Sequence, residues 1–152
     1  MRLIRATAAE CEAMAAAHAQ AFDKPWREDE FEDLLEGEGI YGFLADDDDV
    51  ALGLILCRMA AGEVEVLTVG VTPQARRRGV ALALMLAALD IAREAGTSAA
   101  FLEVAVDNDA AITLYELMGF VRTGLRKAYY DRGPAGVVDA LVMRLDLTPA
   151  AA

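Results

Sequence analysis

The stretch from residue 63 to residue 106 constrains the fold most, because strand and helix patterns alternate along it. Glu63–Val71 alternates apolar and polar side chains, which is typical of a strand. Val80–Ala95 is apolar and long enough for a helix, and Gly96 follows it, as glycine often follows a helix end. Ala99–Val106 has a strand pattern again. This alternation predicts an α/β domain with a mixed sheet.

The rest of the chain extends this pattern without a repeat or a linker. The predicted order is a strand, two helices, three strands, a helix, a strand, a helix and two strands. The capping-box pattern of Thr7 and Glu10 marks the start of the first helix. A chain of 152 residues, 56% of them apolar, suits one domain, which we place at 1–147, followed by a frayed tail at 148–152. The remaining predicted strands are Leu3–Ala6, Ile40–Ala45, Val50–Met59, Val121–Tyr130 and Val137–Leu147, and the remaining predicted helices are Thr7–Ala21, Glu28–Glu36 and the segment from Asp107 to Gly119.

Composition argues against several classes of protein. The formal net charge of −11 is unlike the basic surface that binds nucleic acid, and it favours a cationic partner, such as a protonated amine or a basic protein. No apolar run approaches the roughly 20 residues that span a membrane, and the first residues lack the apolar stretch of a signal peptide. Cys11 and Cys57 lie in apolar contexts, so we expect two buried thiols in a reducing cytoplasm.

Two features that could suggest metal or covalent chemistry have simpler interpretations. Asp46–Asp49 lacks the glycine and glutamate spacing of a calcium loop, which favours a solvated hairpin turn. His18, the only histidine, shares a helix face with Cys11, but the two are too far apart for a nucleophile–base contact. We therefore expect a packed or surface role for His18. No cluster of His, Cys and carboxylate residues has zinc-ligand spacing, so no metal is expected.

The loop that opens the long helix carries the strongest functional signal. The first backbone N–H groups of a helix have no partner inside it, and the helix dipole adds positive charge, so a phosphate can bind there. Gly79 permits close approach of the backbone, and Ala81 is nearly as small. Arg76, Arg77 and Arg78 add attraction for phosphate. The alternative is a solvated basic loop that caps an ordinary helix. Neither the Walker A pattern nor the three-glycine dinucleotide pattern is present.

Two motifs resemble the GNAT superfamily of N-acetyltransferases. Arg76-x-x-Gly79-x-Ala81 matches its Q/R-x-x-G-x-G/A acetyl-CoA motif. A longer block is similar to one typical of ribosomal-protein-alanine N-acetyltransferases, the RimI type: Leu102-Glu103-Val104, then Asn108-Asp109-Ala110-Ala111, then Leu114-Tyr115-Glu116-Leu117-Met118-Gly119-Phe120. The resemblance covers nearly the whole chain and includes, in the expected order, Pro25-Trp26, Tyr129-Tyr130 and Asp139-Ala140.

The resemblance implies a fold and a donor site. The sheet would be mixed and mostly antiparallel, flanked by about four helices, with two central strands, Glu63–Val71 and Ala99–Val106, splayed apart. The pantetheine arm of acetyl-CoA would pair with backbone between these strands, and its pyrophosphate would lie on the arginine-rich loop. Glu103 would act as the base and Tyr115 as the acid in a direct attack. The cofactor-binding residues that the resemblance implies are Leu67, Val69, Val71, Arg76, Arg77, Arg78, Gly79, Val80, Ala81 and Asn108.

The acceptor side rests on fewer signals. The aromatic candidates are Trp26, Tyr129 and Tyr130. Their side chains offer rigid surface with a polar edge for an acceptor pocket, or they serve ordinary packing. The acidic candidate, Asp139, could hold a cationic acceptor or pair with an arginine. The RimI type usually has Ser where this chain has Arg27, and the loop through Asp23-Lys24 is slightly longer. The candidate acceptor-binding residues are Trp26, Tyr129, Tyr130 and Asp139.

Three functions remain open at this level. An α-amine has a pKa of about 7.7–8.0 and a lysine side chain about 10.4. More of a protein N-terminus is therefore neutral at pH 7, so its deprotonation needs a weaker base than that of a lysine. The first interpretation is acetylation of a protein N-terminus, such as that of a ribosomal protein, and the second is acetylation of a small amine. The third is a catalytically silent acyl-CoA-binding module. A homodimer could form if the final strand is an exposed edge.

Overall fold

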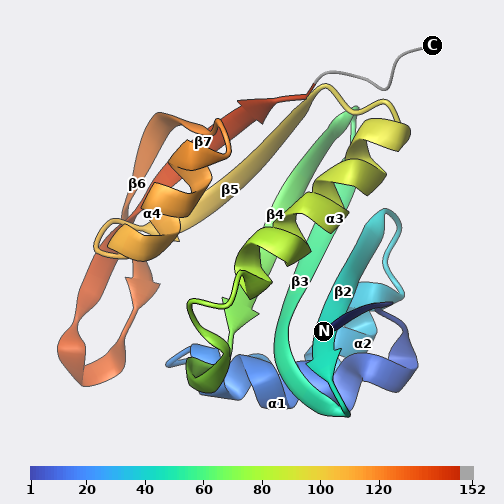
Figure 1. The fold of residues 1–152 in the computed structure, drawn as a ribbon. Coiled ribbons are helices and arrows are strands. Elements are labelled where there is room, and N and C mark those ends of the chain that lie inside the picture. The colour runs from blue at the N-terminus through green and yellow to red at the C-terminus, as the bar shows by residue number, and fades with distance from the viewer. Residues whose placement is uncertain (148–152) are drawn as a thin grey trace.

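Seven strands form one sheet in the order β1-β2-β3-β4-β5-β7-β6 in the computed structural model, which describes residues 1–147 (Figure 1). The proposed tail at 148–152 lies outside the described residues. All neighbouring strands pair antiparallel except β4 and β5, which are parallel. The strands are β1 Arg2–Arg5, β2 Ile40–Asp47, β3 Val50–Ala60, β4 Glu63–Val71, β5 Ala99–Ala105, β6 Val121–Asp131 and β7 Val137–Asp146, and the α-helices are α1 Cys11–Ala21, α2 Glu28–Leu35, α3 Val80–Glu94 and α4 Asp109–Leu117. The predicted mixed, mostly antiparallel α/β fold is confirmed.

The predicted element bounds agree with the structure to within a few residues, and the largest difference lies in the aspartate run. Thr7 forms the predicted capping box with Glu10, at a 3-10 turn that leads into α1. The predicted turn at Asp46–Asp49 is too wide, because Asp46 and Asp47 belong to β2. Asp46 is buried and accepts two hydrogen bonds from Arg2, at 3.0 and 2.8 Å. Only Asp48 and Asp49 form the turn, with φ of 47° and 66°, as two-residue hairpin loops require.

The prediction that the final strand could be an exposed edge is wrong. Strand β7 lies inside the sheet, paired with β5 on one side and β6 on the other. After β6 the chain turns back through residues 132–136 and enters the space beside β5. The edge strand at this end is therefore β6, so the backbone of β7 has no free side for pairing with a second subunit.

Helices cover both faces of the sheet. Helices α3 and α4 lie on one face and α1 and α2 on the other (Figure 1). The buried residues of α3 include Val80, Leu84, Ala88 and Ala92, whose spacing places them on one side of the helix, against the sheet. On the opposite face α1 and α2 enclose a smaller core around Phe31. Within residues 1–147, no helix is both long and apolar enough to cross a membrane.

Strands β4 and β5 pair for only a short distance and then diverge (Figure 1). Their pairing is limited to Glu63 with Ala99, Val64 with Ala100, and Glu65 with Phe101. Beyond that point β4 continues along β3 and β5 continues along β7. The predicted splaying of the two central strands is therefore confirmed.

A bulge at Leu67 accompanies the divergence. The register of β4 against β3 shifts between Val66 and Thr68, so one extra residue lies in β4 there. A bulge reverses which face the following side chains occupy. Val66 belongs to the core under α3, whereas Thr68 contacts His18 of α1, on the other face. The bulge thus turns a polar side chain of β4 toward α1 beside the gap.

Candidate active site

The gap between β4 and β5 leaves backbone hydrogen-bonding groups along its two edges without strand partners. On the β4 side these belong to the segment Leu67–Val71, which pairs with β3 through its other edge. An unpaired strand edge is a template for an extended ligand, which can complete the ladder with its own amide groups. The segment includes the three β4 residues that the family resemblance implies for cofactor binding, Leu67, Val69 and Val71.

The arginine-rich loop lies at the end of β4 and opens α3. Gly79 precedes the first helical residue with φ of 75°, and no side chain caps the helix start. Arg77 is also left-handed, with φ of 63°. Alternating left-handed residues turn successive backbone N–H groups toward one side, which produces a concave anion site. A Cβ built on Gly79 would meet no protein atom within 4 Å, so the space before the helix is open. These residues fit a phosphate ligand.

Arg78 and Asn108 each have a polar contact within the protein. Arg78 is half-exposed and lies 3.6 Å from Asp47, at the end of β2. Asn108 caps α4, because its side-chain oxygen accepts the N–H of Ala111 at 3.3 Å. This use of the oxygen leaves the amide NH₂ group of Asn108 for another partner. Asn108 follows β5 at the gap, on the side opposite the arginine-rich loop.

Glu103 and Tyr115 lie on opposite faces of β5. Leu102 and Val104 belong to the core under α3, so Glu103 between them points to the other face. Tyr115 of α4 is only 6% exposed and belongs to the same core as Leu102 and Val104. Burial, with Tyr130 nearby, raises the pKa of the Tyr115 hydroxyl well above its usual value. The hydroxyl is therefore protonated at neutral pH and available as a donor.

The Glu103 carboxylate has a partner that the sequence did not suggest. Arg126 of β6 donates to Glu103 Oε1 at 2.6 Å, and its guanidinium lies 4.2 Å from the centre of the Tyr129 ring. Tyr130 donates its hydroxyl to the backbone carbonyl of Glu103 at 3.1 Å, and burial raises its pKa to about 12. Two adjacent tyrosines of β6 thus surround Glu103. Nothing in the sequence pairs Arg126 with a residue 23 positions earlier.

Asp139 makes a contact that the sequence did not suggest, and no arginine pairs with its carboxylate among residues 1–147. Its carboxylate accepts the backbone N–H of Ala128 at 2.7 Å, and Ala128 has a positive φ of 51°. The register of β6 against β7 is irregular between Arg126 and Tyr130. Asp139 therefore supports a bulge that places Tyr129 and Tyr130 beside Glu103.

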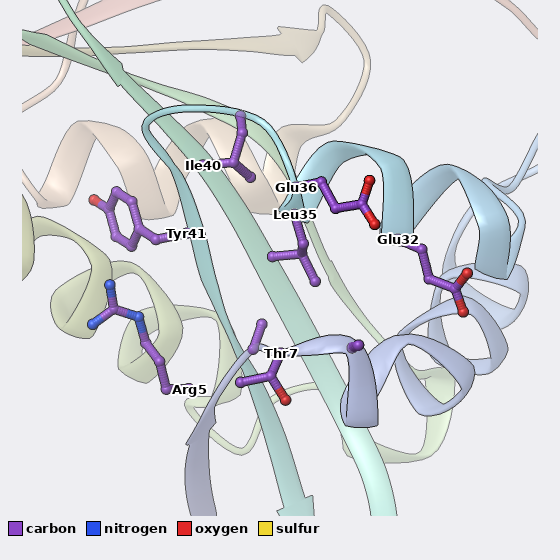
Figure 2. Close-up of a pocket in the computed structure, with 9 residues that line it drawn as sticks. Arg5, Thr7, Glu32, Leu35, Glu36, Ile40 and Tyr41 are labelled. Carbon is purple, nitrogen blue, oxygen red and sulfur yellow. The ribbon is translucent and has the colours of Figure 1, made fainter.

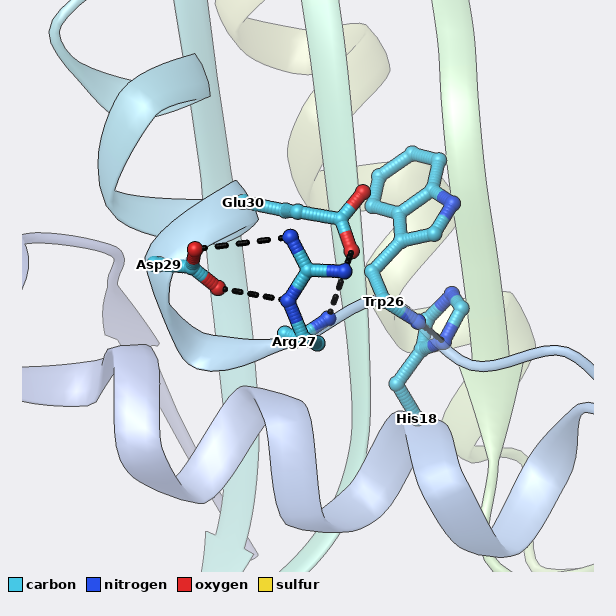
Figure 3. Close-up of polar contacts among 5 residues, drawn as sticks. All are labelled: His18, Trp26, Arg27, Asp29 and Glu30. Carbon is cyan, nitrogen blue, oxygen red and sulfur yellow. Dashed lines mark hydrogen bonds and ion pairs between the residues drawn. The ribbon is translucent and has the colours of Figure 1, made fainter.

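A buried histidine holds the loop between α1 and α2 against β4. Trp26 donates its backbone N–H to His18 Nδ1 at 3.0 Å (Figure 3), so His18 Nε2 carries the proton and donates to Thr68 at 3.1 Å. The His18 ring stacks on Phe22 and Trp26, with centroids 4.2 and 5.1 Å away. Burial lowers the pKa of His18 to about 4. Of the two predicted roles for His18, the packed one is confirmed, and Trp26 packs on it.

The two departures from the RimI pattern have structural consequences. Arg27 precedes α2, and its guanidinium lies between the carboxylates of Asp29 and Glu30, at 3.0 and 3.3 Å (Figure 3). The Glu30 carboxylate also accepts the Arg27 backbone N–H at 3.1 Å, but no side chain caps the first N–H groups of α2, as a serine would. Lys24, from the longer loop, lies 2.6 Å from Asp131 at the end of β6. That ion pair joins the α1–α2 loop to the β6–β7 hairpin.

Two cavities differ in their relation to these residues. One of about 450 Å³ lies on the face of the sheet that Glu103 occupies, and it is lined by Glu103, Glu65, Phe101 and Val142 among others. The other, of about 620 Å³, lies between β1, β2 and α2 (Figure 2). None of the predicted site residues lines that second cavity. Within residues 1–147, no three His, Cys, Asp or Glu side chains are placed to hold a metal ion.

Comparison with known proteins gives a consistent result. The model of the Acetyltransferase (GNAT) family matches residues 10–120. The chain is 45% identical over 84 residues to the N-alpha-acetyltransferase RimI of Mycobacterium tuberculosis, which covers 55% of the chain but only 49% of that protein. The [Ribosomal protein bS18]-alanine N-acetyltransferase of Escherichia coli K12 is 30% identical over 130 residues, covering 86% of the chain and 85% of that protein.

A solved structure extends the likeness to the whole fold. The crystal structure of the ribosomal-protein-S18-alanine N-acetyltransferase from Escherichia coli superposes with a TM-score of 0.89 at 26% identity. The superposition covers 99% of this chain and 96% of that one.

The buried neutral His18 predicts a specific dependence of stability on pH. Its folded-state pKa of about 4 lies below the ordinary 6.5, so the unfolded chain binds the proton more readily. Its contribution is therefore complete above about pH 6.5 and is lost as the pH falls toward 4. Between about pH 7.5 and pH 4.5, we expect urea unfolding to show the wild type losing about 2–3 kcal/mol more than His18→Gln. Parallel stability profiles for the two proteins would contradict this assignment.

Proposed function

The chain belongs to the GNAT family of acetyltransferases, and on this premise we propose that it transfers the acetyl group of acetyl-CoA to a primary amine. The observation that carries the proposal is the short pairing of β4 with β5. It leaves a gap with the arginine-rich loop at one end, and Glu103 and Tyr115 lie on opposite faces of the strand that borders it. The proposed acceptor is the N-terminal α-amine of a protein such as a ribosomal protein.

The donor is held by backbone more than by side chains. In the proposal, the free edge of Leu67–Val71 pairs with the pantetheine arm, and Asn108 contacts the arm from the opposite side. Backbone N–H groups from Arg77 to Ala81 bind the pyrophosphate, and the guanidinium groups of Arg76 and Arg78 add charge. Acetyl-CoA supplies an activated thioester, and these residues orient it. The left-handed Gly79 with open space before it supports this arrangement.

The proton chemistry is divided between the two faces of β5. Glu103 accepts the proton of the acceptor's ammonium, directly or through a water molecule, so that a neutral nitrogen can attack. A thiolate leaves, and a thiol has a pKa near 8.5, so a donor must protonate it at neutral pH. The Tyr115 hydroxyl is the proposed donor, because it is protonated at neutral pH and belongs to the core face of β5, opposite Glu103. No side chain of this chain forms a covalent bond in the proposal.

The proposed acceptor is supported by the relatives and by acid–base chemistry. The Escherichia coli relative is named for the alanine of a ribosomal protein and the mycobacterial relative for an α-amine. An α-amine needs less help from the base than a lysine, by about 2.5 pKa units. The Trp26 loop and the Tyr129–Tyr130 segment, joined through Lys24 and Asp131, would form the walls of the acceptor groove. The buried free thiols Cys11 and Cys57 suit the cytoplasm, where we place the reaction.

The anion site predicts that Gly79→Ala weakens CoA binding. Both Gly79 and Gly62 have positive φ, of 75° and 78°, and no protein atom lies within 4 Å of a Cβ on either. Alanine should therefore cost both sites about 1 kcal/mol of stability, through backbone strain alone. Only at Gly79 would the methyl group meet the phosphates, and calorimetric titration should show CoA affinity falling about tenfold or more. Equal CoA affinity in Gly79→Ala and Gly62→Ala would exclude this site.

The acid role predicts that Tyr115→Phe slows turnover about 10²-fold with little change in acetyl-CoA affinity. Tyr41→Phe is the matched control, because Tyr41 is buried and donates to the Ala88 carbonyl at 2.7 Å, away from the gap. It should lower stability but leave the rate per folded molecule unchanged. Unchanged turnover in Tyr115→Phe would remove Tyr115 as the proton donor.

Release of free CoA on two acceptor panels tests the proposed function as a whole. One panel contains peptides with free Ala, Ser, Met or basic N-termini, and the other contains polyamines, amino acids and aminoglycosides. We expect turnover on a peptide and its loss when the N-terminus is blocked. Turnover on small amines alone would exclude the protein acceptor, and silence on both panels despite acetyl-CoA binding would exclude the enzyme in favour of a regulatory module.

A further inference from the structure

A cation of the protein itself occupies the space beside the proposed base. The Arg126 guanidinium lies between the Glu103 carboxylate, at 2.6 Å, and the face of the Tyr129 ring, 4.2 Å from its centre. The Glu103 side chain is 20% exposed, whereas that of Arg126 is 54% exposed. One partner of this ion pair is thus fixed in the sheet, and the other reaches it from the solvent side.

A carboxylate facing an aromatic ring is a binding site for ammonium ions in general. The carboxylate supplies opposite charge, and the ring face supplies the negative side of its quadrupole. The acceptor amine of the proposed reaction arrives mostly as an ammonium ion, because its pKa exceeds neutral pH. It must approach Glu103 to lose its proton, and Arg126 is already there. The guanidinium and the acceptor ammonium therefore compete for one position.

We propose that, in the free protein, the Arg126 guanidinium occupies the binding position of the acceptor's ammonium group, and that acceptor binding displaces it from Glu103. This inference rests on the proposed function, and it defines the ammonium subsite as the Glu103 carboxylate and the Tyr129 ring. Charge at Glu103 is balanced before and after the exchange, because one cation replaces another. Arg126 is a positioning residue in this scheme, because it acts through Glu103 and takes no part in proton transfer.

The subsite does not depend on Arg126 for its shape. The bulge that carries Tyr129 is held by Asp139, which accepts the Ala128 N–H, and by Tyr130, which donates to the Glu103 carbonyl. These contacts remain when the guanidinium leaves. Exposed ion pairs contribute little net free energy, so displacing Arg126 from Glu103 by an incoming ammonium costs little free energy. Glu65 on β4 acts electrostatically on Arg126 and offers the displaced guanidinium a second carboxylate.

Arginine side-chain NMR on the CoA-loaded protein tests the displacement directly. The probe is L-alaninamide, which carries a free α-ammonium, and the control is N-acetyl-L-alaninamide, which lacks it. The Nε–Hε signal of Arg126 is assigned by its absence in Arg126→Met. We expect alaninamide to move this signal toward the position of a free arginine, with no such change from the control compound or at Arg122. An Arg126 signal that does not shift on addition of alaninamide, or that shifts equally with both compounds, would overturn the proposal.

Kinetics then separate this role from a merely structural one. Arg126→Met keeps the length of the stem but removes the charge, and Arg122→Met removes an arginine of the same strand that pairs with Glu116 instead, at 3.4 Å. We expect Arg126→Met to lower KM for the acceptor about two- to fivefold without altering KM for acetyl-CoA, and Arg122→Met to alter neither. An acceptor KM that is unchanged or raised in Arg126→Met would contradict competition between Arg126 and the acceptor for Glu103.

The two tests fail in different ways. Turnover on peptides, together with an Arg126 that alaninamide cannot displace, would refute the proposed displacement of Arg126 from Glu103 and leave the proposed function intact. Displacement of Arg126 by alaninamide in a protein that acetylates no acceptor would refute the proposed function and support an amine-binding site.

Discussion

The early end of pairing between β4 and β5 is the constraint on which the rest of the structure depends. Only three residue pairs join the two strands, and beyond them β5 stays paired with β7 and β4 with β3. The bulge at Leu67 and the insertion of β7 beside β5 both keep the strands apart. The cost is a strand edge without partners, and a ligand with amide groups of its own can satisfy it. The arginine-rich loop lies at the same end of β4, so the free strand edge and the positive charge would act on the proposed donor together.

Polar contacts between segments distant in the sequence fix the chain around this gap. His18 connects Thr68, just past the bulge, with the backbone of Trp26, and its lowered pKa keeps it neutral. On the other side, Asp139 and Tyr130 hold the β6 bulge next to Glu103. The α1–α2 loop and the β6–β7 hairpin are then joined by Lys24 and Asp131. These contacts fix backbone positions, so the groups proposed for catalysis are held by segments far apart in the sequence.

The sequence predicted what is local, and it missed what depends on long-range packing. Periodicity identified each strand and helix, and the motif from Arg76 to Ala81 located the helix start with its left-handed glycine. The place of β7 inside the sheet could not be read from the chain, because strand order is set by packing of distant segments. The pairing of Arg126 with Glu103 and the fixing of Trp26 by His18 were missed for the same reason. Asp46 looked like a turn residue because the pattern does not reveal its contact with Arg2.

The central claim is that the unpaired edge of β4 is completed by the pantetheine arm of the donor. Amide hydrogen exchange of Leu67–Val71, measured with and without CoA, tests it most directly. In the free protein, the amides that face the gap should exchange faster than those bonded to β3. CoA should slow their exchange about tenfold or more, with no change in β1. Saturating CoA that leaves the exchange of Leu67–Val71 unchanged would contradict the claim.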